Sequence, residues 1–170
     1  MAPLVRRTWA PIGQTPILYQ RTGAREKVSM IGALTVSPRR RRVGLYFSLL
    51  TNQNVKAGNL IPFLRELRVH LGGRFLLVWD RLNVHRGVRT QEFLARLKTV
   101  RAEFLPPYAP ELNPVEGLWG YLKMNPLANH APRDADELAD KAGWIVREVQ
   151  DDTHLLRSFI RRTPLSLCLK

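Results

Sequence analysis

The chain has 170 residues, of which 45% are hydrophobic, and it carries a formal net charge of +13 with a pI near 11.0. This length excludes a large multidomain protein and fits one domain with a core, or one domain with a small helical appendage. No apolar run approaches the length of a membrane span, and the N-terminus lacks a signal-peptide core, so we expect no membrane partner. The single cysteine, Cys168, excludes an internal disulfide and suits the cytoplasm.

Basic charge is concentrated in the first half of the chain. Residues 1–79 carry 13 Lys or Arg and two acids, whereas residues 80–170 carry 14 Lys or Arg and 12 acids. The densest point is the run Arg39, Arg40, Arg41 and Arg42. A solvated turn is the ordinary explanation of such a run. The overall charge favours contact with the phosphates of a nucleic acid, and we expect these four arginines to bind DNA.

The predicted elements begin with two strands. Alternating apolar residues predict strands over 27–36 and 43–50, with SPRRRR as the hairpin connection. Leucines at helical spacing predict a helix in AGNLIPFLRELRVHL, which Gly72 and Gly73 end. The continuous apolar run at 74–80 predicts a strand that is buried on both faces and belongs to a parallel part of the sheet.

The remaining segments alternate helix and strand and then become helical. VRTQEFLARLKT predicts a helix, VRAEF a strand, and NPVEGLWGYLK a helix that begins after a proline-rich stretch. Two further helices are predicted near the C-terminus, the first with a capping box between Asp134 and Glu137. This order predicts an α/β fold built on a mixed sheet flanked by helices.

Asp80 follows five apolar residues at the end of a predicted buried strand. Ligands of open α/β sheets gather outside the carboxyl ends of the strands, and an acid placed there is unfavourable unless something pairs with it. We therefore predict that Asp80 binds a metal ion. The local alternative is that Asp80 caps the turn DRLN that follows it.

Glu116 has both a local and a functional interpretation. Asn113 is suited to cap the next helix, Pro114 to occupy its first position, and Glu116 to reach back in a capping box. The stretch PPYAP before them stiffens the backbone more than a cap requires, which is useful if a carboxylate must hold a metal ion in place. Lys123 lies about two turns further along the same helix, where it contacts either DNA phosphate or solvent.

Asp80 and Glu116 are hard ligands from different elements, which is the donor type that Mg²⁺ prefers. Two such ions about 3.5 to 4 Å apart promote phosphodiester chemistry by activating a nucleophile and stabilising the leaving oxygen. A two-ion site of this kind requires a third carboxylate, which usually bridges the ions.

The segments RTWAPIGQTPIL, LLVWDRLNVHRG and FLPPYAPELNPVEGLWGYLK together resemble bacterial insertion-sequence transposases of the mariner superfamily. The resemblance implies an RNase H-like catalytic domain over residues 1–130, a C-terminal helical extension over 131–170, and cut-and-paste DNA transposition with Mg²⁺ or Mn²⁺. By position, Asp80 resembles the second acid of the catalytic triad and Glu116 the third. His85 matches a family histidine, for which we expect a role in packing or bonding the turn, and Arg81 stands where the family often has Asn.

The first triad acid has no counterpart in this sequence. In the family it ends a strand before the segment that corresponds to RTWAPIGQTP, and here the acids before Asp80 are Glu26 and Glu66, neither placed at a strand end. We therefore expect a fold that lacks its first, central strand and a chain with little cleavage activity alone. An upstream-frame polypeptide joined by frameshifting would supply the missing acid and the helix-turn-helix modules, and a decayed gene fragment is the other explanation.

Three functions compete at this point. The leading one is the catalytic portion of a transposase at the bacterial nucleoid, which acts on transposon ends and target DNA, and for which a homodimer is one expected state. The second is a non-catalytic DNA-binding fragment that regulates transposition, and the third is another RNase H-like nuclease that acts on RNA–DNA hybrids. A basic structural protein of the ribosomal kind does not require the arrangement of Asp80 and Glu116.

Overall fold

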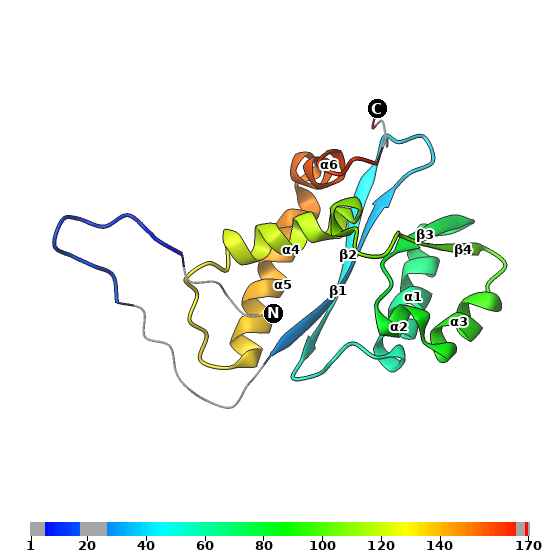
Figure 1. Ribbon diagram of the computed structural model, residues 1–170, viewed down its shortest axis with the longest axis horizontal. Coiled ribbons are helices and arrows are strands. Elements are labelled where there is room, and N and C mark those ends of the chain that lie inside the picture. The colour runs from blue at the N-terminus through cyan, green and yellow to red at the C-terminus, as the bar shows by residue number, and fades with distance from the viewer. Residues whose placement is uncertain (1–5, 18–26, 166–168, 170) are drawn as a thin grey trace.

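The computed structural model of the protein describes residues 6–17, 27–165 and 169; Glu26 and Cys168 lie outside them. The elements follow the predicted order, with a short extra helix after the third strand (Figure 1). They are β1 (Val28–Val36), β2 (Val43–Thr51), α1 (Ala57–Leu71), β3 (Phe75–Trp79), α2 (Asn83–Arg86), α3 (Val88–Ala95), β4 (Val100–Phe104), the 3₁₀ helix η1 (Pro110–Leu112), α4 (Pro114–Met124), α5 (Ala135–Asp151) and α6 (Thr153–Arg161).

The sheet is present in two parts. Strands β1 and β2 form an antiparallel hairpin with Val28 opposite Thr51 and Val36 opposite Val43. Strands β3 and β4 form a parallel pair, and within the described residues no strand joins β1 to β3. The edges of β1 and β3 that face away from their partners are therefore not paired with another described strand.

The prediction that β3 is buried on both faces is wrong for one face. Leu77 and Trp79 pack against the core, whereas Leu76 is 57% exposed and Val78 is 47% exposed. Their neighbours on β4 are Arg101 and Glu103, which are also exposed and form an ion pair. The reason for the difference is that no described element covers this face of the β3–β4 pair.

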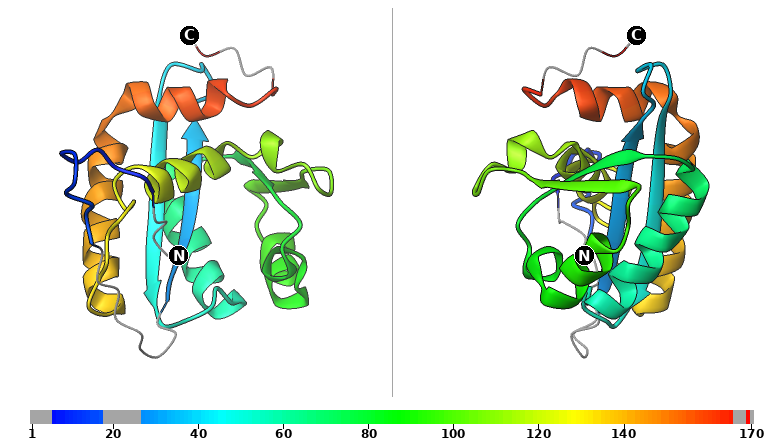
Figure 2. Two further views of the ribbon diagram at one scale, coloured as in Figure 1. Left: turned by 60° about the vertical axis from the view of Figure 1, so that its left-hand side comes forward. Right: turned by 90° about the vertical axis from the view of Figure 1, so that its right-hand side faces the viewer.

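The β1–β2 hairpin separates two hydrophobic cores (Figure 2). On one face, Val28 and Leu45 pack with residues of α4, α5 and α6. On the other face, Ile31 packs with Leu64 of α1 and with Trp79 of β3, so the second core joins the two parts of the sheet. Apolar residues on both faces explain why the hairpin is held between layers of helices.

Local sequence signals fix most helix ends. Gly72 and Gly73 follow α1 with φ of +59° and +68°, a backbone region that favours glycine, and this confirms the predicted stop. Asp134 accepts a hydrogen bond from the backbone N–H of Glu137, as predicted. The reciprocal half of the capping box is not formed, because the Glu137 carboxylate bonds to the backbone and side chain of Arg133 instead.

Residues 6–17 form an extended arm in which the side chains of Trp9 and Ile12 are fully exposed. The arm is attached through Arg6, whose backbone N–H donates to the side chain of Asn129.

No helix among the described residues is both long and apolar enough to cross a bilayer.

Helix α4 depends on a close approach to β1 at Gly32. A Cβ added at Gly32 would lie 2.7 Å from the ring of Trp119 in α4. We therefore expect Gly32→Ala to lower the free energy of unfolding by about 1–3 kcal/mol through overpacking, measured by urea denaturation.

The matched control is Gly120→Ala in α4, where an added Cβ meets nothing within 4 Å. Alanine in a helix interior is about 0.5–1 kcal/mol more favourable than glycine, so this variant should be at least as stable as the wild type. Equal effects of the two substitutions would contradict the proposed packing of α4 on β1.

Candidate functional site

Asp80 directly follows β3, and its side chain bonds to the turn that comes after it. Its Oδ1 accepts hydrogen bonds from the backbone N–H of Leu82 at 3.0 Å and from Nδ1 of His85 at 2.7 Å. The first of these bonds is the turn cap that the sequence suggested as the local alternative. Both bonds use the same oxygen, which leaves Oδ2 of a side chain that is 36% exposed to meet a ligand.

His85 holds the Asp80 carboxylate from a fixed position. Its ring stacks on the buried ring of Trp79, with centroids 4.3 Å apart and planes inclined by 12°. The backbone carbonyl of His85 accepts a hydrogen bond of 2.6 Å from the side chain of Gln91 in α3. The role expected from the sequence, bonding within the turn, is therefore present, and it extends to the carboxylate itself.

Arg81 is directed across the sheet end rather than toward Asp80. Its Nε donates a hydrogen bond of 3.2 Å to the carbonyl of Leu105, and its guanidinium lies over the ring of Phe104 at 5.7 Å. The backbone N–H of Leu105 in turn donates to the carbonyl of Trp79 at 2.8 Å. These contacts tie the chain leaving β3 to the chain leaving β4.

Glu116 lies in the first turn of α4, and the predicted cap is present without the capping box. The side chain of Asn113 accepts a hydrogen bond from the backbone N–H of Val115 at 3.2 Å. The backbone N–H of Asn113, which a capping-box glutamate would bind, donates to the carbonyl of Pro110 at 2.9 Å. Within the described residues nothing donates a hydrogen bond to the Glu116 carboxylate, so this side chain is not used as a cap.

Asp80 and Glu116 line the same cavity, which has a volume of about 340 Å³. Its walls are the turn after β3 and the proline-rich connection from β4 to α4, from Leu105 to Asn113. In this connection Tyr108 has a φ of +57° and its side chain is fully exposed. The cavity is thus formed by two loop segments that leave neighbouring parallel strands.

The electrostatics of the cavity are those of a like-charge pair. Burial raises the pKa of the Glu116 carboxyl above its ordinary value, and the negative charge of Asp80 raises it further. Lys123 opposes both effects and lowers the pKa of Glu116. Asp80 and Lys123 therefore both act on Glu116, whereas Arg39, Arg40, Arg41 and Arg42 lie at the β1–β2 turn and do not line this cavity.

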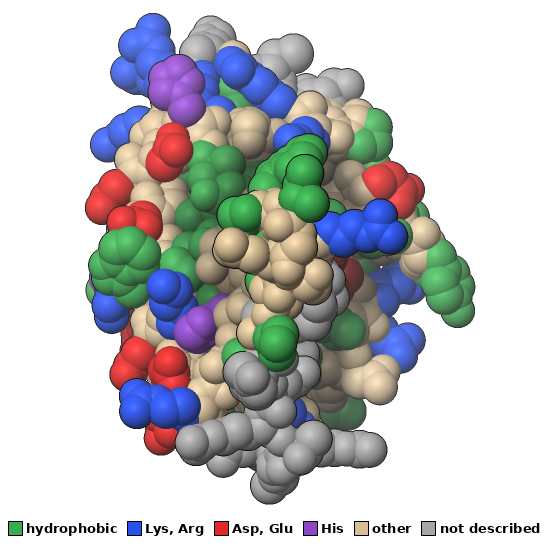
Figure 3. All heavy atoms as spheres, turned by 90° about the vertical axis from the view of Figure 1, so that its left-hand side faces the viewer, with side chains coloured by type: hydrophobic (Ala, Val, Ile, Leu, Met, Phe, Trp, Pro, Cys, Tyr) green, Lys and Arg blue, Asp and Glu red, His purple; other side chains and the backbone are tan. Residues whose placement is uncertain are grey.

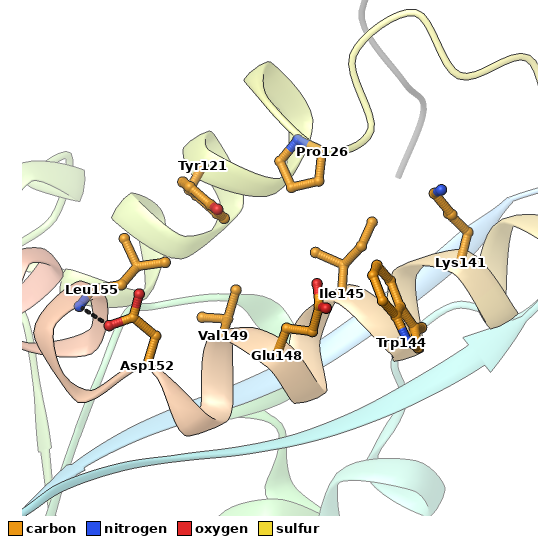
Figure 4. A pocket seen from close by; sticks show the side chains of 9 residues that line it. All are labelled: Tyr121, Pro126, Lys141, Trp144, Ile145, Glu148, Val149, Asp152 and Leu155. Carbon is orange, nitrogen blue, oxygen red and sulfur yellow. Dashed lines mark hydrogen bonds between the residues drawn. The ribbon is translucent and has the colours of Figure 1, made fainter.

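A second cavity, of about 210 Å³, lies between α4 and α5 (Figure 4). Its lining includes Tyr121, Trp144 and the acids Glu148 and Asp152. Asp152 accepts a hydrogen bond from the backbone N–H of Leu155 and so caps α6. Because that carboxylate is used as a helix cap, we place the candidate site in the cavity of Asp80 and Glu116.

A family model described as "DDE superfamily endonuclease" matches residues 2–139. The chain belongs to this family. A curated relative, "Uncharacterized protein y4pE/y4sA" of Sinorhizobium fredii (strain NBRC 101917 / NGR234), is 49% identical over 43 residues, which cover 24% of this chain and 32% of the relative.

Solved structures with the same fold include transposase complexes of Mos1. A Mos1 strand transfer complex and a Mos1 mariner paired-end complex with Mn match this DDE-family chain with TM-scores of 0.62 and 0.63, at 18% identity. Each match covers 96% of this chain and about half of the Mos1 chain, 48% and 49%. The comparison confirms the predicted fold class, the RNase H-like α/β fold of the Mos1 catalytic domain.

Sequence reasoning missed the contact between His85 and the Asp80 carboxylate. The spacing D-x-x-x-x-H was visible, but it does not reveal that the short helix α2 turns the ring back onto the acid. The sequence places Trp79 in a strand, but it does not indicate that its ring stacks on that of His85.

The raised pKa of Glu116 gives the first prediction for the site. The folded state holds this proton over a pH range in which the unfolded chain has lost it, so the stability from this group falls as pH rises from about 4.5 through the folded pKa. We expect Glu116→Gln to melt at a higher temperature than the wild type near pH 7 in the presence of a chelator. Below the ordinary carboxyl pKa the two should melt together.

The measurement is a series of thermal melts of both proteins from acidic to neutral pH. Glu111→Gln is the control, since this exposed carboxylate lies outside the cavity lining. A Glu116→Gln variant that is less stable than the wild type at neutral pH would contradict the like-charge pair.

Proposed function

We propose that this chain is the catalytic portion of a transposase that cleaves and transfers DNA strands. The observation that supports the proposal best is that Asp80 and Glu116, from the end of β3 and the start of α4, line one cavity in a DDE-family chain. Both acids are separated by 35 residues of sequence, and neither carboxylate is neutralised by a salt bridge from Lys or Arg among the described residues. A site of this kind suits a cationic cofactor and a phosphodiester substrate.

The donor set fits one hard divalent cation, Mg²⁺ or Mn²⁺. Oδ2 of Asp80 and the carboxylate of Glu116 are the groups that would hold it, and the remaining ligands of such ions are commonly water and substrate phosphate. A bound ion would supply Lewis-acid chemistry, by which it would activate a hydroxyl nucleophile or stabilise the leaving oxygen of the phosphodiester. The chain's own residues position the acids: His85 and the Leu82 N–H orient Asp80, and the cap at Asn113 fixes the turn that carries Glu116.

The described residues do not complete a two-ion site. No group of three metal-ligating side chains occurs among the described residues. Glu66, the acid of the first half that is described, lies exposed on α1. We therefore propose that a second polypeptide, translated from an upstream frame, contributes the third carboxylate together with the DNA-end-binding modules.

No described strand pairs with the outer edges of β1 and β3, which supports this division of the site. A strand added along β3 would pair with its outer edge and cover part of the surface around the exposed Leu76 and Val78. We propose the same boundary as the sequence suggested, with the catalytic domain over residues 1–130 and a helical extension over 131–170. The extension packs on β1 and β2 through α5 and α6.

DNA contacts are proposed for the arginines of the β1–β2 turn and for Lys123. Arg39, Arg40, Arg41 and Arg42 are all exposed, and Lys123 is close enough to Glu116 to affect its pKa. We propose transposon ends and target DNA as the substrates and the bacterial nucleoid as the place of action, with a homodimer as the species that pairs two ends.

Binding of Mn²⁺ tests the metal site without requiring catalysis. We expect titration calorimetry to detect Mn²⁺ binding by the chain alone and to show at least a ten-fold loss in Asp80→Asn or Glu116→Gln, because each removes a charged ligand. Asp140→Asn on α5 is the control, since it removes a carboxylate outside the cavity. Unchanged affinity in both site variants would refute the metal assignment.

Strand cleavage tests the function itself. With a supercoiled plasmid carrying the matching transposon ends and Mn²⁺, we expect little nicking by the chain alone, because no third carboxylate joins Asp80 and Glu116 among the described residues. Co-expression with the upstream-frame polypeptide should give nicking that Asp80→Asn abolishes.

Two outcomes would overturn parts of this proposal. Robust Asp80-dependent nicking by the chain alone would refute the need for a second polypeptide. DNA binding with no nicking in the presence of the upstream polypeptide would instead favour a non-catalytic regulator of transposition.

A further inference from the structure

We infer that helix α6 and the turn of the β1–β2 hairpin form one continuous surface that binds the phosphate backbone of duplex DNA. The surface consists of Arg39–Arg42 in the turn and of Arg157, Arg161 and Arg162 in and directly after α6. This inference rests on the proposed function only in taking DNA as the partner, and it adds a C-terminal half of the surface that the charge of the sequence does not indicate.

A direct contact joins the two segments. The guanidinium of Arg157 donates a hydrogen bond of 3.0 Å to the backbone carbonyl of Arg41, across 116 positions of sequence. The buried face of α6, made by Leu156, Phe159 and Ile160, packs into the core beside β2. Figure 2 shows α6 lying across the end of the hairpin at which the turn is located. The two groups of arginines are therefore held side by side.

The turn that presents the four arginines is well ordered by hydrogen bonds. The hydroxyl of Ser37 accepts bonds from the backbone N–H groups of Arg41 and Arg42 at 3.3 and 3.0 Å. The N–H of Ser37 donates to the carbonyl of Arg42 at 2.9 Å, and Arg40 adopts a φ of +56°. A fixed turn keeps the four charges together at the end of the hairpin, instead of letting them separate as they would in a loose loop.

Seven arginines meet on this surface without an acid in either segment. Residues 37–42 contain four arginines, residues 153–162 contain three, and neither stretch contains Asp or Glu. The nearest acid in sequence, Asp152, caps the opposite end of α6. That end is about 13 Å from Arg161 along a helix of nine residues, which is beyond the Debye length at physiological salt. Such a cluster repels itself, and a polyanion relieves the repulsion while releasing its own counterions.

Helix α5, which precedes α6, has an excess of acidic residues. Helix α5 carries five acids and two basic residues, so basic charge is not spread evenly over the C-terminal region. Figure 3 shows most of the visible acidic side chains (red) along the left side of this face, whereas Lys and Arg side chains (blue) occur at its top and also elsewhere on the face. Arginine matches phosphate geometry better than lysine, and all seven residues of the surface are arginine.

The experiment measures the salt dependence of binding to a duplex DNA of about 20 base pairs by fluorescence anisotropy, in chelator so that no cleavage occurs. We expect R161A/R162A to lower the slope of log affinity against log salt by about one to two, as loss of two phosphate contacts requires. R39A/R40A should have a similar effect. R161K/R162K, which keeps the charge, should retain most of the slope.

The matched control is K141A/R147A, which removes two exposed charges from α5. An effect of R161A/R162A no larger than that of this control would overturn the inference. So would loss of DNA binding in R161K/R162K while its melting temperature stays that of the wild type, because the effect would then not follow charge. Binding of phosphatidylserine vesicles that requires Arg161 and Arg162, with DNA binding unchanged in R161A/R162A, would also overturn it. None of these outcomes depends on strand cleavage, so failure here is distinct from failure of the proposed function.

Discussion

Two carboxylates that repel each other face one cavity, and much of the surrounding structure keeps them there. Asp80 is oriented by the ring of His85, which rests on the buried Trp79, and by the backbone N–H of Leu82. Glu116 is carried by a capped helix turn behind a proline-rich connection. Burial and, to a smaller extent, the negative charge of Asp80 raise the pKa of Glu116, and a cation bound between the acids would lower it.

The two acids belong to different parts of the fold. Asp80 follows β3 in the parallel pair, whereas Glu116 begins α4, which packs on β1 of the hairpin through Gly32 and Trp119. Among the described residues, the β1–β2 hairpin and the β3–β4 pair are held together by the hydrophobic core that they share with α1. A strand bound between them would therefore act on the geometry of the site directly, since it would fix the position of one acid relative to the other.

Charge is organised by faces of the folded molecule rather than by halves of the sequence. The near balance of residues 80–170 conceals an acidic α5 and a basic end of α6, because the two helices are adjacent in sequence but expose different surfaces. The hydrogen bond between Arg157 and Arg41 brings the basic part of the second half to the arginine-rich turn of the first. A polyanion that follows this surface would contact segments from both halves of the sequence.

The sequence by itself determined the features that depend on neighbouring residues. Apolar alternation set β1 and β2, leucine spacing set α1, Gly72 and Gly73 ended it, and Asn113 capped α4. Tertiary structure decided what requires contact between distant residues: the exposure of Leu76 and Val78, the bond between His85 and Asp80, and the joining of α6 to the hairpin turn. Periodicity and helix capping involve residues a few positions apart, so they can be recognised in the sequence. The contacts between distant surfaces depend on how whole helices and strands pack, and no local sequence pattern specifies that packing.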